Sequence, residues 1–265
     1  MTRRTEGAPR RPERRDLGQQ VEGRRAVREL LVAGRRRAHE VLISVDAERS
    51  PILAEIAELG SRAGARVRRV PADEITRRAR TDAPQGVVAF AAPVEPVELD
   101  DLLRDRAAFL VALDGVTDPQ NLGAVLRTAE TAGASGAVLA RHRAVGITPS
   151  VTKAAAGAVE HLPLAFVGGI PGALERASRA GVWSVGLDAG GDVALFGLPI
   201  ADRPLVLVLG AEGRGLSRLT RARCDVVAAI PMRGAIDSLN VSAAAAVACY
   251  EIARQRGDNL EGTPG

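Results

Sequence analysis

Three segments of the chain concentrate glycine, amide, carboxylate and guanidinium groups, and each begins where an apolar run ends. They are residues 118–130, residues 210–216, and residues 230–232 continued by 238–242. Glycines allow a backbone to approach a ligand closely, and amides, carboxylates and arginine can orient a reacting group and stabilise developing charge. The repeated placement predicts one composite site.

The glycines of the second segment do not form a standard nucleotide-binding loop. Gly210, Gly213 and Gly215 fail the G-x-G-x-x-G pattern, because Arg218 occupies the position of the last glycine, and no GxxxxGK[ST] motif occurs. A tight turn between a strand and a helix would explain one glycine better than three with Glu212 among them. Close approach of the backbone to a ligand is the better interpretation.

Nucleophilic and metal-based chemistry find no support in the residue pattern. Cys224 has no local histidine and precedes an apolar strand, which is typical of a small buried hydrophobe. His39, His142 and His161 are dispersed, so no zinc site or catalytic triad can be assembled and we expect no metal. The chemistry must then rely on Asn, Arg, Glu and Ser side chains, with a bound cofactor supplying the reactive group.

Some of the polar residues also have simpler interpretations. Asp118 and Asn121 could cap a helix, as such residues often do. Arg127 falls in the second turn of the same helix among apolar positions, where a charged group requires a partner. A structural salt bridge with Glu130 or Glu212 would provide that partner.

The composition limits the kinds of partner. Aromatic residues make up only 2% of the 265 residues, so stacking surfaces for bases are scarce and an RRM-type or OB-type domain is disfavoured. The chain has 36 basic and 32 acidic residues, and the first 100 residues carry the surplus, with 20 arginines against 16 acidic residues. Lys153 is the only lysine. Guanidinium groups form bidentate hydrogen bonds with phosphates, so a phosphate-rich partner would explain the predominance of arginine. The arginine codons of a GC-rich genome are the alternative explanation.

Cysteine usage and hydropathy bear on the cellular context. Cys224 and Cys249 are too few for a disulfide framework and lack metal-type spacing. No apolar stretch approaches about 18 residues, and the arginine-rich start has no apolar signal region. We therefore expect a soluble, cytoplasmic protein without a membrane partner.

The apolar pattern predicts two domains between polar ends. Residues 1–18 lack apolar periodicity and are expected to be a disordered basic arm, either a nonspecific phosphate tether or a solvated tail. Residues 19–92 alternate helix and strand patterns and predict a small α/β domain. A linker at 93–107, a larger domain at 108–257 and a tail at 258–265 follow.

In the larger domain, near-continuous apolar runs alternate with helical patterns, which predicts a parallel sheet covered by helices on both faces. Ligands in such sheets bind outside the carboxyl ends of the strands. The three polar segments follow Leu113, Leu209 and Ile230, where this rule expects a site. The predicted strands are 109–113, 136–140, 164–167, 182–187, 205–209 and 226–230.

In order and spacing, the three segments resemble the three motifs of the SpoU (TrmH) family of SPOUT RNA ribose 2'-O-methyltransferases. Motif one looks like residues 118–130, motif two like 209–216 and motif three like 230–242. Together they cover most of the stretch from 109 to 256. The resemblance implies methyl transfer from S-adenosylmethionine to a ribose 2'-oxygen of RNA.

The N-terminal domain adds a second resemblance. Residues 23–27 (GRRAV) and 85–89 (QGVVA) look like the ribosomal-protein-L30-like substrate-binding domain of family members that modify 23S rRNA. Lys153 and residues 157–160 are similar to those members as well, whereas Ala155 stands where relatives often have serine. The resemblance therefore implies an α/β fold with a small L30-like domain followed by a SPOUT α/β-knot domain.

The resemblance implies more than periodicity could show. In the family, S-adenosylmethionine lies in a deep trefoil knot of the C-terminal chain, and members usually form homodimers. Knots are rare exceptions to ordinary chain topology, so the apolar pattern alone predicts an unknotted doubly wound sheet.

Site residues follow motif by motif. The resemblance assigns the cofactor contacts, largely through backbone atoms, to Gly210, Ile230 and Leu239, and it places Ala211 and Met232 nearby in the cofactor site. It assigns the polar catalytic positions to Asn121, Arg127, Glu212, Ser238 and Asn240.

Arg127 is the family's proposed activator of the ribose hydroxyl, but a guanidinium is almost always protonated and is an awkward general base. We expect Arg127 to grip the adjacent phosphate and to stabilise negative charge developing on the 2'-oxygen. Asn121, Ser238 and Asn240 would orient reacting groups, and Glu212 would hold the arginine or its own loop.

The N-terminal domain is expected to select the RNA. A guanosine of 23S rRNA, free or in a large-subunit precursor, is the expected substrate, and DNA is not expected as a partner. The alternatives are a tRNA ribose 2'-O-methyltransferase, an antibiotic-resistance methyltransferase acting on 23S rRNA, and a noncatalytic RNA-binding or ribosome-assembly factor on the same fold.

Overall fold

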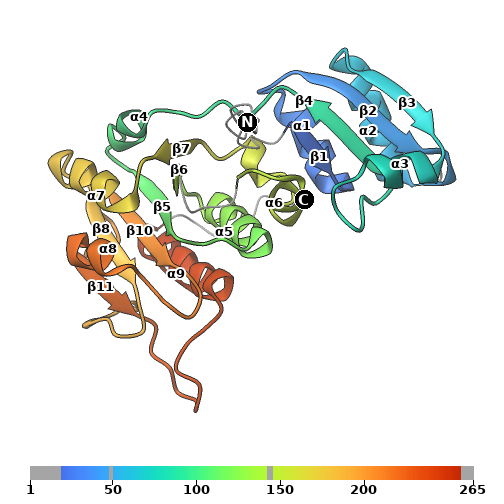
Figure 1. The fold of residues 1–265 in the computed structure, drawn as a ribbon. Coiled ribbons are helices and arrows are strands. Elements are labelled where there is room, and N and C mark those ends of the chain that lie inside the picture. The colour runs from blue at the N-terminus through green and yellow to red at the C-terminus, as the bar shows by residue number, and fades with distance from the viewer. Residues whose placement is uncertain (1–18, 48–49, 142–145, 258–265) are drawn as a thin grey trace, which may run out of the picture.

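The computed structural model describes residues 19–47, 50–141 and 146–257. The expected basic arm at 1–18, the tail at 258–265 and His142 lie outside the described residues. The described chain forms two lobes, each built around its own sheet (Figure 1).

The smaller lobe contains a four-stranded mixed sheet in the order β1-β4-β2-β3. Strands β2 and β3 are parallel, and β4 runs antiparallel to both β1 and β2. Helices α1 and α2 cover one face, because their apolar residues recur at helical spacing and share a core with the sheet. The elements are β1 (Gln20–Glu22), α1 (Arg24–Ala33), β2 (Ala38–Ser44), η1 (Val45–Ala47), α2 (Pro51–Arg62), β3 (Arg66–Val70), α3 (Ala72–Arg78) and β4 (Val87–Ala91).

The larger lobe contains a seven-stranded sheet in the order β7-β6-β5-β10-β8-β11-β9, and every pairing in it is parallel. Two apolar clusters cover its faces, one including residues of α5, α6 and α9 and the other residues of α4 and α7 (Figure 1). Burial on both faces explains the continuous apolar runs of the strands. The prediction of a parallel sheet between two helical layers is confirmed.

The bounds of the larger lobe follow the apolar pattern closely. All six predicted strands are present, and the two-residue strand β9 was too short to predict. The elements are α4 (Leu99–Leu103), β5 (Phe109–Asp114), α5 (Pro119–Thr131), β6 (Gly136–Ala140), α6 (Pro149–Ala154), η2 (Ala158–Glu160), β7 (Leu164–Val167), α7 (Ile170–Arg179), β8 (Trp183–Leu187), β9 (Val193–Ala194), β10 (Leu205–Gly210), α8 (Arg218–Arg223), β11 (Val226–Ala229) and α9 (Val241–Gln255).

The lobes meet where α1 and β1 contact α6 and η2. Arg36, in the turn between α1 and β2, donates from Nε and Nη2 to the two carboxylate oxygens of Glu160, at 2.8 and 2.5 Å. Its Nη1 donates to the carbonyl oxygen of Ala92 at 2.7 Å. Only 5% of the Arg36 side chain and 2% of the Glu160 side chain are exposed. A buried bidentate ion pair therefore joins the two lobes.

No helix among the described residues is long and apolar enough to cross a membrane.

Candidate active site

The three polar segments converge at one edge of the larger sheet. Strand β10 lies between β5 and β8, and β8 pairs with β11, so the carboxyl ends of four parallel strands are neighbours. A cavity of about 540 Å³ opens there. All five residues predicted to bind the cofactor line it, as do three of the five predicted catalytic residues. The predicted residues in its wall are Gly210, Ala211, Glu212, Ile230, Met232, Ser238, Leu239 and Asn240.

The loop after β10 is built by close backbone contacts. Ala211 and Gly215 exchange two backbone hydrogen bonds, of 3.1 and 2.9 Å, which close the loop over four residues. A Cβ at Gly210 would collide with backbone atoms of Gly215 and Leu216. Gly213 and Gly215 have φ of +71° and +62°, in the left-handed region that glycine adopts readily. The glycines therefore form a tight loop, which is the interpretation that the sequence disfavoured, and this loop places its backbone at the cavity.

Three predicted polar residues form one hydrogen-bonded group at the cavity rim. Asn121 Nδ2 and Asn240 Nδ2 donate to the same oxygen of Glu212, Oε1, at 2.7 and 2.6 Å. Asn240 Nδ2 also lies 3.2 Å from Asn121 Oδ1. One carboxylate thus fixes the orientation of two amides that come from segments 119 residues apart in the sequence. This arrangement holds the polar groups in place before any ligand arrives.

Helix caps position these side chains. Asp118 caps α5 by accepting hydrogen bonds from the backbone N–H groups of Gln120 and Asn121. Asn240 caps α9 by accepting from Ser242 N at 2.8 Å, while its amide nitrogen reaches Glu212. The capping interpretation therefore holds for Asp118, and Asn240 combines a cap with a contact at the site.

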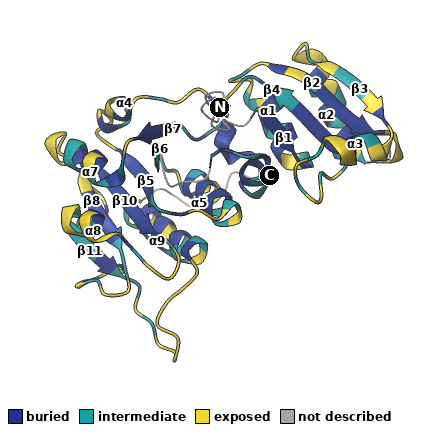
Figure 2. Ribbon diagram, in the orientation of Figure 1, coloured by how far each residue is buried: buried dark blue, intermediate teal, exposed yellow. Residues whose placement is uncertain are grey.

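The loop between β11 and α9 carries the remaining predicted residues. Most of it is exposed (Figure 2), and Leu239 is 44% exposed. Ser238 Oγ donates to Asp237 Oδ1 at 3.2 Å, so its hydroxyl contacts its own loop and not the group around Glu212.

Arg127 is the one predicted site residue that lies elsewhere. It does not line this cavity, its side chain is exposed, and no ion pair joins it to Glu130 or Glu212 in the described part of the chain. Six residues separate it from Asn121, which places the two about 120° apart around α5 and about 9 Å along its axis. The salt-bridge partner that the sequence led us to expect for Arg127 is therefore unnecessary, because water solvates its exposed guanidinium. Glu212 holds the two amides and does not hold Arg127.

One wall of the cavity was not predicted from the sequence. Leu187, Asp188 and Ala189, at the end of β8, also line it. Asp188 Oδ1 accepts from Arg221 Nη1 at 2.8 Å and from Gly190 N at 2.9 Å. The signal was present, because Asp188 is a polar residue directly after an apolar strand, as in the three segments that were identified.

The cysteines have structural roles. Burial raises the pKa of the Cys224 thiol to about 12 and that of the Cys249 thiol to about 12. Both therefore remain protonated near neutral pH and are poor nucleophiles. In the described ranges no group of three or more His, Cys, Asp or Glu residues could hold a metal ion.

The cavity suits a small organic cofactor. Its volume falls within the roughly 300 to 1,000 Å³ of typical small-molecule sites. Its wall combines apolar side chains such as Leu187, Leu209 and Ile230 with exposed loop backbone at Gly210 and Ala211. S-adenosylmethionine has an apolar adenine face, hydrogen-bonding edges and a charged amino-acid end, so these residues fit it, and Asp188 supplies a carboxylate.

Fold and site together define an α/β enzyme that binds a small cofactor at the carboxyl edge of a parallel sheet and carries a second, smaller domain. Residues 108–250 match the model of the SpoU rRNA Methylase family, and residues 20–97 match the model for RNA 2'-O ribose methyltransferase substrate binding. The chain belongs to the SpoU family. It is an RNA 2'-O-ribose methyltransferase that uses S-adenosylmethionine.

Relatives and solved structures agree with this assignment. A putative TrmH family tRNA/rRNA methyltransferase, YacO of Bacillus subtilis, is 39% identical over 76% of this chain and 82% of its own. The 23S rRNA (guanosine-2'-O-)-methyltransferase RlmB of Ralstonia nicotianae is 43% identical over 72% of this chain and 78% of its own. The SpoU methyltransferase AviRb from Streptomyces viridochromogenes, in complex with the cofactor AdoMet, superposes with a TM-score of 0.76 at 27% identity over 91% of each chain.

Proposed function

We propose that the chain methylates the ribose 2'-hydroxyl of a guanosine in 23S rRNA. One observation carries this proposal. The hydrogen-bonded group of Asn121, Glu212 and Asn240 lies at the rim of a cavity that every predicted cofactor residue lines. The identity to the RlmB relative supports the choice of 23S rRNA.

In this proposal Gly210, Ala211, Ile230, Met232 and Leu239 hold S-adenosylmethionine. The cofactor supplies an electrophilic methyl group. Asn121, Ser238 and Asn240 orient the target ribose, and Glu212 keeps the two amides in place.

Arg127 has a separate role in this proposal. It grips the phosphate next to the target nucleotide and stabilises negative charge on the 2'-oxygen as the proton leaves. Its position outside the cofactor cavity suits contact with RNA backbone beyond the reacting ribose. Arg127→Ala should lower single-turnover methylation at saturating RNA by roughly two to four orders of magnitude, and near-normal turnover would rule out both roles.

We further propose that the larger domain contains the trefoil knot of its family and that the enzyme acts as a homodimer. Several exposed apolar side chains support a partner copy, since Phe196 is 52% exposed, Ile236 76% and Tyr250 39%. Sedimentation velocity would test the dimer, and a monomer at micromolar concentration would exclude it.

A tRNA substrate is the second candidate, and the coverage of the solved structures argues against it. A structure described as showing 2-OH methylation of C/U34 on tRNA spans 97% of its own chain but only 57% of this one, at a TM-score of 0.51. The rRNA methyltransferase of Sinorhizobium meliloti with bound AdoMet spans 89% of this chain and 87% of its own, at 0.74. An added substrate domain therefore favours rRNA.

The deciding experiment incubates the protein with radiolabelled S-adenosylmethionine and unmodified 23S rRNA or tRNA. Label is then mapped by nuclease resistance at the methylated ribose linkage. Label at a guanosine of 23S rRNA is expected. Label confined to tRNA would overturn the substrate assignment, and binding of RNA without label in any RNA or ribosomal precursor would favour the noncatalytic assembly factor.

A further inference from the structure

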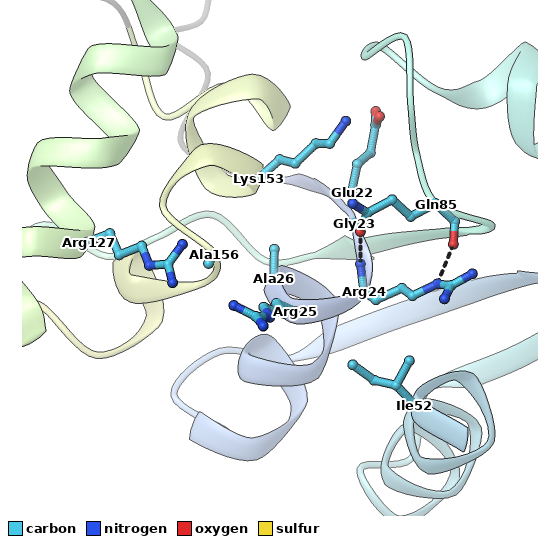
Figure 3. Close-up of a pocket in the computed structure, with 10 residues that line it drawn as sticks. All are labelled: Glu22, Gly23, Arg24, Arg25, Ala26, Ile52, Gln85, Arg127, Lys153 and Ala156. Carbon is cyan, nitrogen blue, oxygen red and sulfur yellow. Dashed lines mark hydrogen bonds between the residues drawn. The ribbon is translucent and has the colours of Figure 1, made fainter. Parts of the chain in front are cut away.

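A second cavity, also of about 540 Å³, lies at the junction of the two lobes. One wall comes from β1, the start of α1 and the turn before β4, and the other from α5, α6 and the turn after α6 (Figure 3). Neither lobe alone encloses it. Its lining residues are Glu22, Gly23, Arg24, Arg25, Ala26, Ile52, Gln85, Arg127, Lys153 and Ala156.

The cavity has an excess of positive charge. Arg24, Arg25, Arg127 and Lys153 line it, and Lys153 is the only lysine in a chain that otherwise uses arginine. In the described residues no ion pair or hydrogen bond holds the charged ends of Arg25, Arg127 or Lys153. In Figure 3, Arg127 of the larger lobe and Arg25 of the smaller lobe point toward each other, and Lys153 of the larger lobe extends toward Glu22 of the smaller lobe. Like charges gathered around one cavity repel each other unless an anion binds between them.

The one carboxylate in the wall does not neutralise these cations. Glu22 is buried, and its oxygens accept hydrogen bonds from Arg80 N at 2.6 Å and from Thr81 N and Oγ1 at 3.1 and 2.6 Å. It also accepts from Gln20 Nε2 at 2.9 Å. Glu22 keeps its negative charge, so one carboxylate faces four cations in the wall and the cavity retains an excess of positive charge.

Backbone strain is concentrated at the same place. Gln85 and Ala156, with φ of +60° and +51°, are the only non-glycine residues with positive φ in the described chain, and both line this cavity. Such conformations cost about 1 kcal/mol or more and cluster at functional sites. At Gln85 the strained backbone orients a cation, because its carbonyl oxygen accepts from Arg24 Nε at 3.0 Å and its Oε1 from Arg24 N at 3.0 Å.

We propose that this interlobe cavity binds a phosphodiester segment of the substrate RNA, with Lys153 and Arg25 as ligands contributed by different lobes. The inference rests on the proposed function for the identity of the polyanion. A site of about 540 Å³ is larger than one inorganic phosphate needs, and it contains Arg127 of the first motif. RNA that enters here passes from the substrate domain to α5, the helix that also carries Asn121 toward the cofactor cavity.

Because each lobe supplies cations, RNA binding and docking of the lobes must favour each other. Any ligand that contacts both walls binds the docked arrangement more tightly, and by linkage it stabilises that arrangement. The affinity for RNA therefore depends on whether the two lobes are docked.

The test measures the salt dependence of RNA binding for Lys153→Met, which keeps the length of the side chain and removes its charge. In vitro transcribed 23S rRNA is titrated by filter binding between about 50 and 200 mM salt. Loss of one phosphate contact should reduce the magnitude of the slope of log K against log salt by about 0.7 to 0.9. Between the two salt concentrations, the decrease in affinity should therefore be about threefold smaller for the variant than for the wild type. Lys153→Arg should restore the slope.

Arg179→Met is the matched control, since Arg179 is a 77% exposed cation on α7, away from the junction. Its slope should equal that of the wild type. Equal slopes for Lys153→Met and wild type would overturn the proposal. A second result would also overturn it: inorganic phosphate binds the wild type but not Lys153→Met, and the two proteins have the same RNA slope. The cavity would then be a site for small anions.

Binding of S-adenosylmethionine to each variant shows that the larger domain is folded. The RNA slope requires no methyl transfer, so the two proposals fail separately. If the wild type methylates rRNA and Lys153→Met leaves the salt slope unchanged, only the proposed RNA site in the cavity is wrong. If Lys153→Met lowers the slope and the wild type methylates no RNA, only the proposed reaction is wrong.

Discussion

Removal of the charge of Glu160 should weaken docking of the two lobes by about 3 to 5 kcal/mol. The Arg36–Glu160 pair is almost completely buried and bidentate, and deletion of one partner of such a pair leaves an uncompensated buried charge. In Glu160→Gln we expect the lower end of this range, because Arg36 keeps its hydrogen bond to the carbonyl oxygen of Ala92. About 3 kcal/mol corresponds to roughly a hundredfold increase in the population of the undocked state.

Hydrogen exchange is the suitable assay, since it reports local opening separately from global unfolding. The hydrogen-bonded amides in and next to η2, residues 158–162, which lie at the junction, should exchange roughly a hundredfold faster in Glu160→Gln than in wild type. Glu58→Gln is the control, because the Arg62–Glu58 pair is exposed on α2, with 70% and 63% of the two side chains accessible, and should contribute no more than about 0.5 kcal/mol.

The double variant Arg36→Met/Glu160→Leu tests the physical reason. Replacement of both charges by apolar groups removes the uncompensated charge, so docking should recover most of the loss seen in the single variant. Unchanged exchange at the junction in Glu160→Gln, or a double variant worse than the sum of its singles, would refute the reasoning.

Three further predictions follow from the site and the core. Gly210→Ala should weaken S-adenosylmethionine binding at least about tenfold by calorimetry, because its Cβ would collide with backbone, whereas Gly172→Ala, with open space around it, should bind normally. Glu212→Ala should lower single-turnover methylation by roughly ten- to a hundredfold, since two amides lose their common acceptor, and unchanged turnover would exclude a role for the group. The pKa of Glu251 is lowered to about 2, first by its hydrogen bond with Arg254 and then by Gly197 N–H and Gln255, so its stabilisation is fully present above about pH 4.5 and is lost as the pH falls toward 2. Urea unfolding of wild type and Glu251→Gln should therefore differ by about 1 to 3 kcal/mol at pH 6 and converge near pH 2, and a difference that does not change with pH would contradict this.

Much of the fold could be predicted from the sequence because it depends on local patterns of apolar residues. The runs that became β5, β10 and β11 are apolar without interruption, as strands buried on both faces must be. The first strand, β1, could not be predicted, because two of its three residues are polar and are buried only through hydrogen bonds to distant parts of the chain.

The sequence by itself determined that three of the segments at the cofactor site lie together, since polar and glycine-rich stretches after buried strands must meet at the carboxyl edge of a parallel sheet. Only the tertiary structure decided where each side chain points. Asn121 and Arg127 share one helix and one motif, yet Asn121 contacts Glu212 of the cofactor cavity and Arg127 lines the interlobe cavity, because the helical rotation between them separates their directions. The partner of Arg36 is 124 residues away, and Gln85 and Ala156, which come from different lobes, line one cavity. Such contacts depend on how two separately folded sheets are placed against each other, and no local pattern of residues encodes that placement.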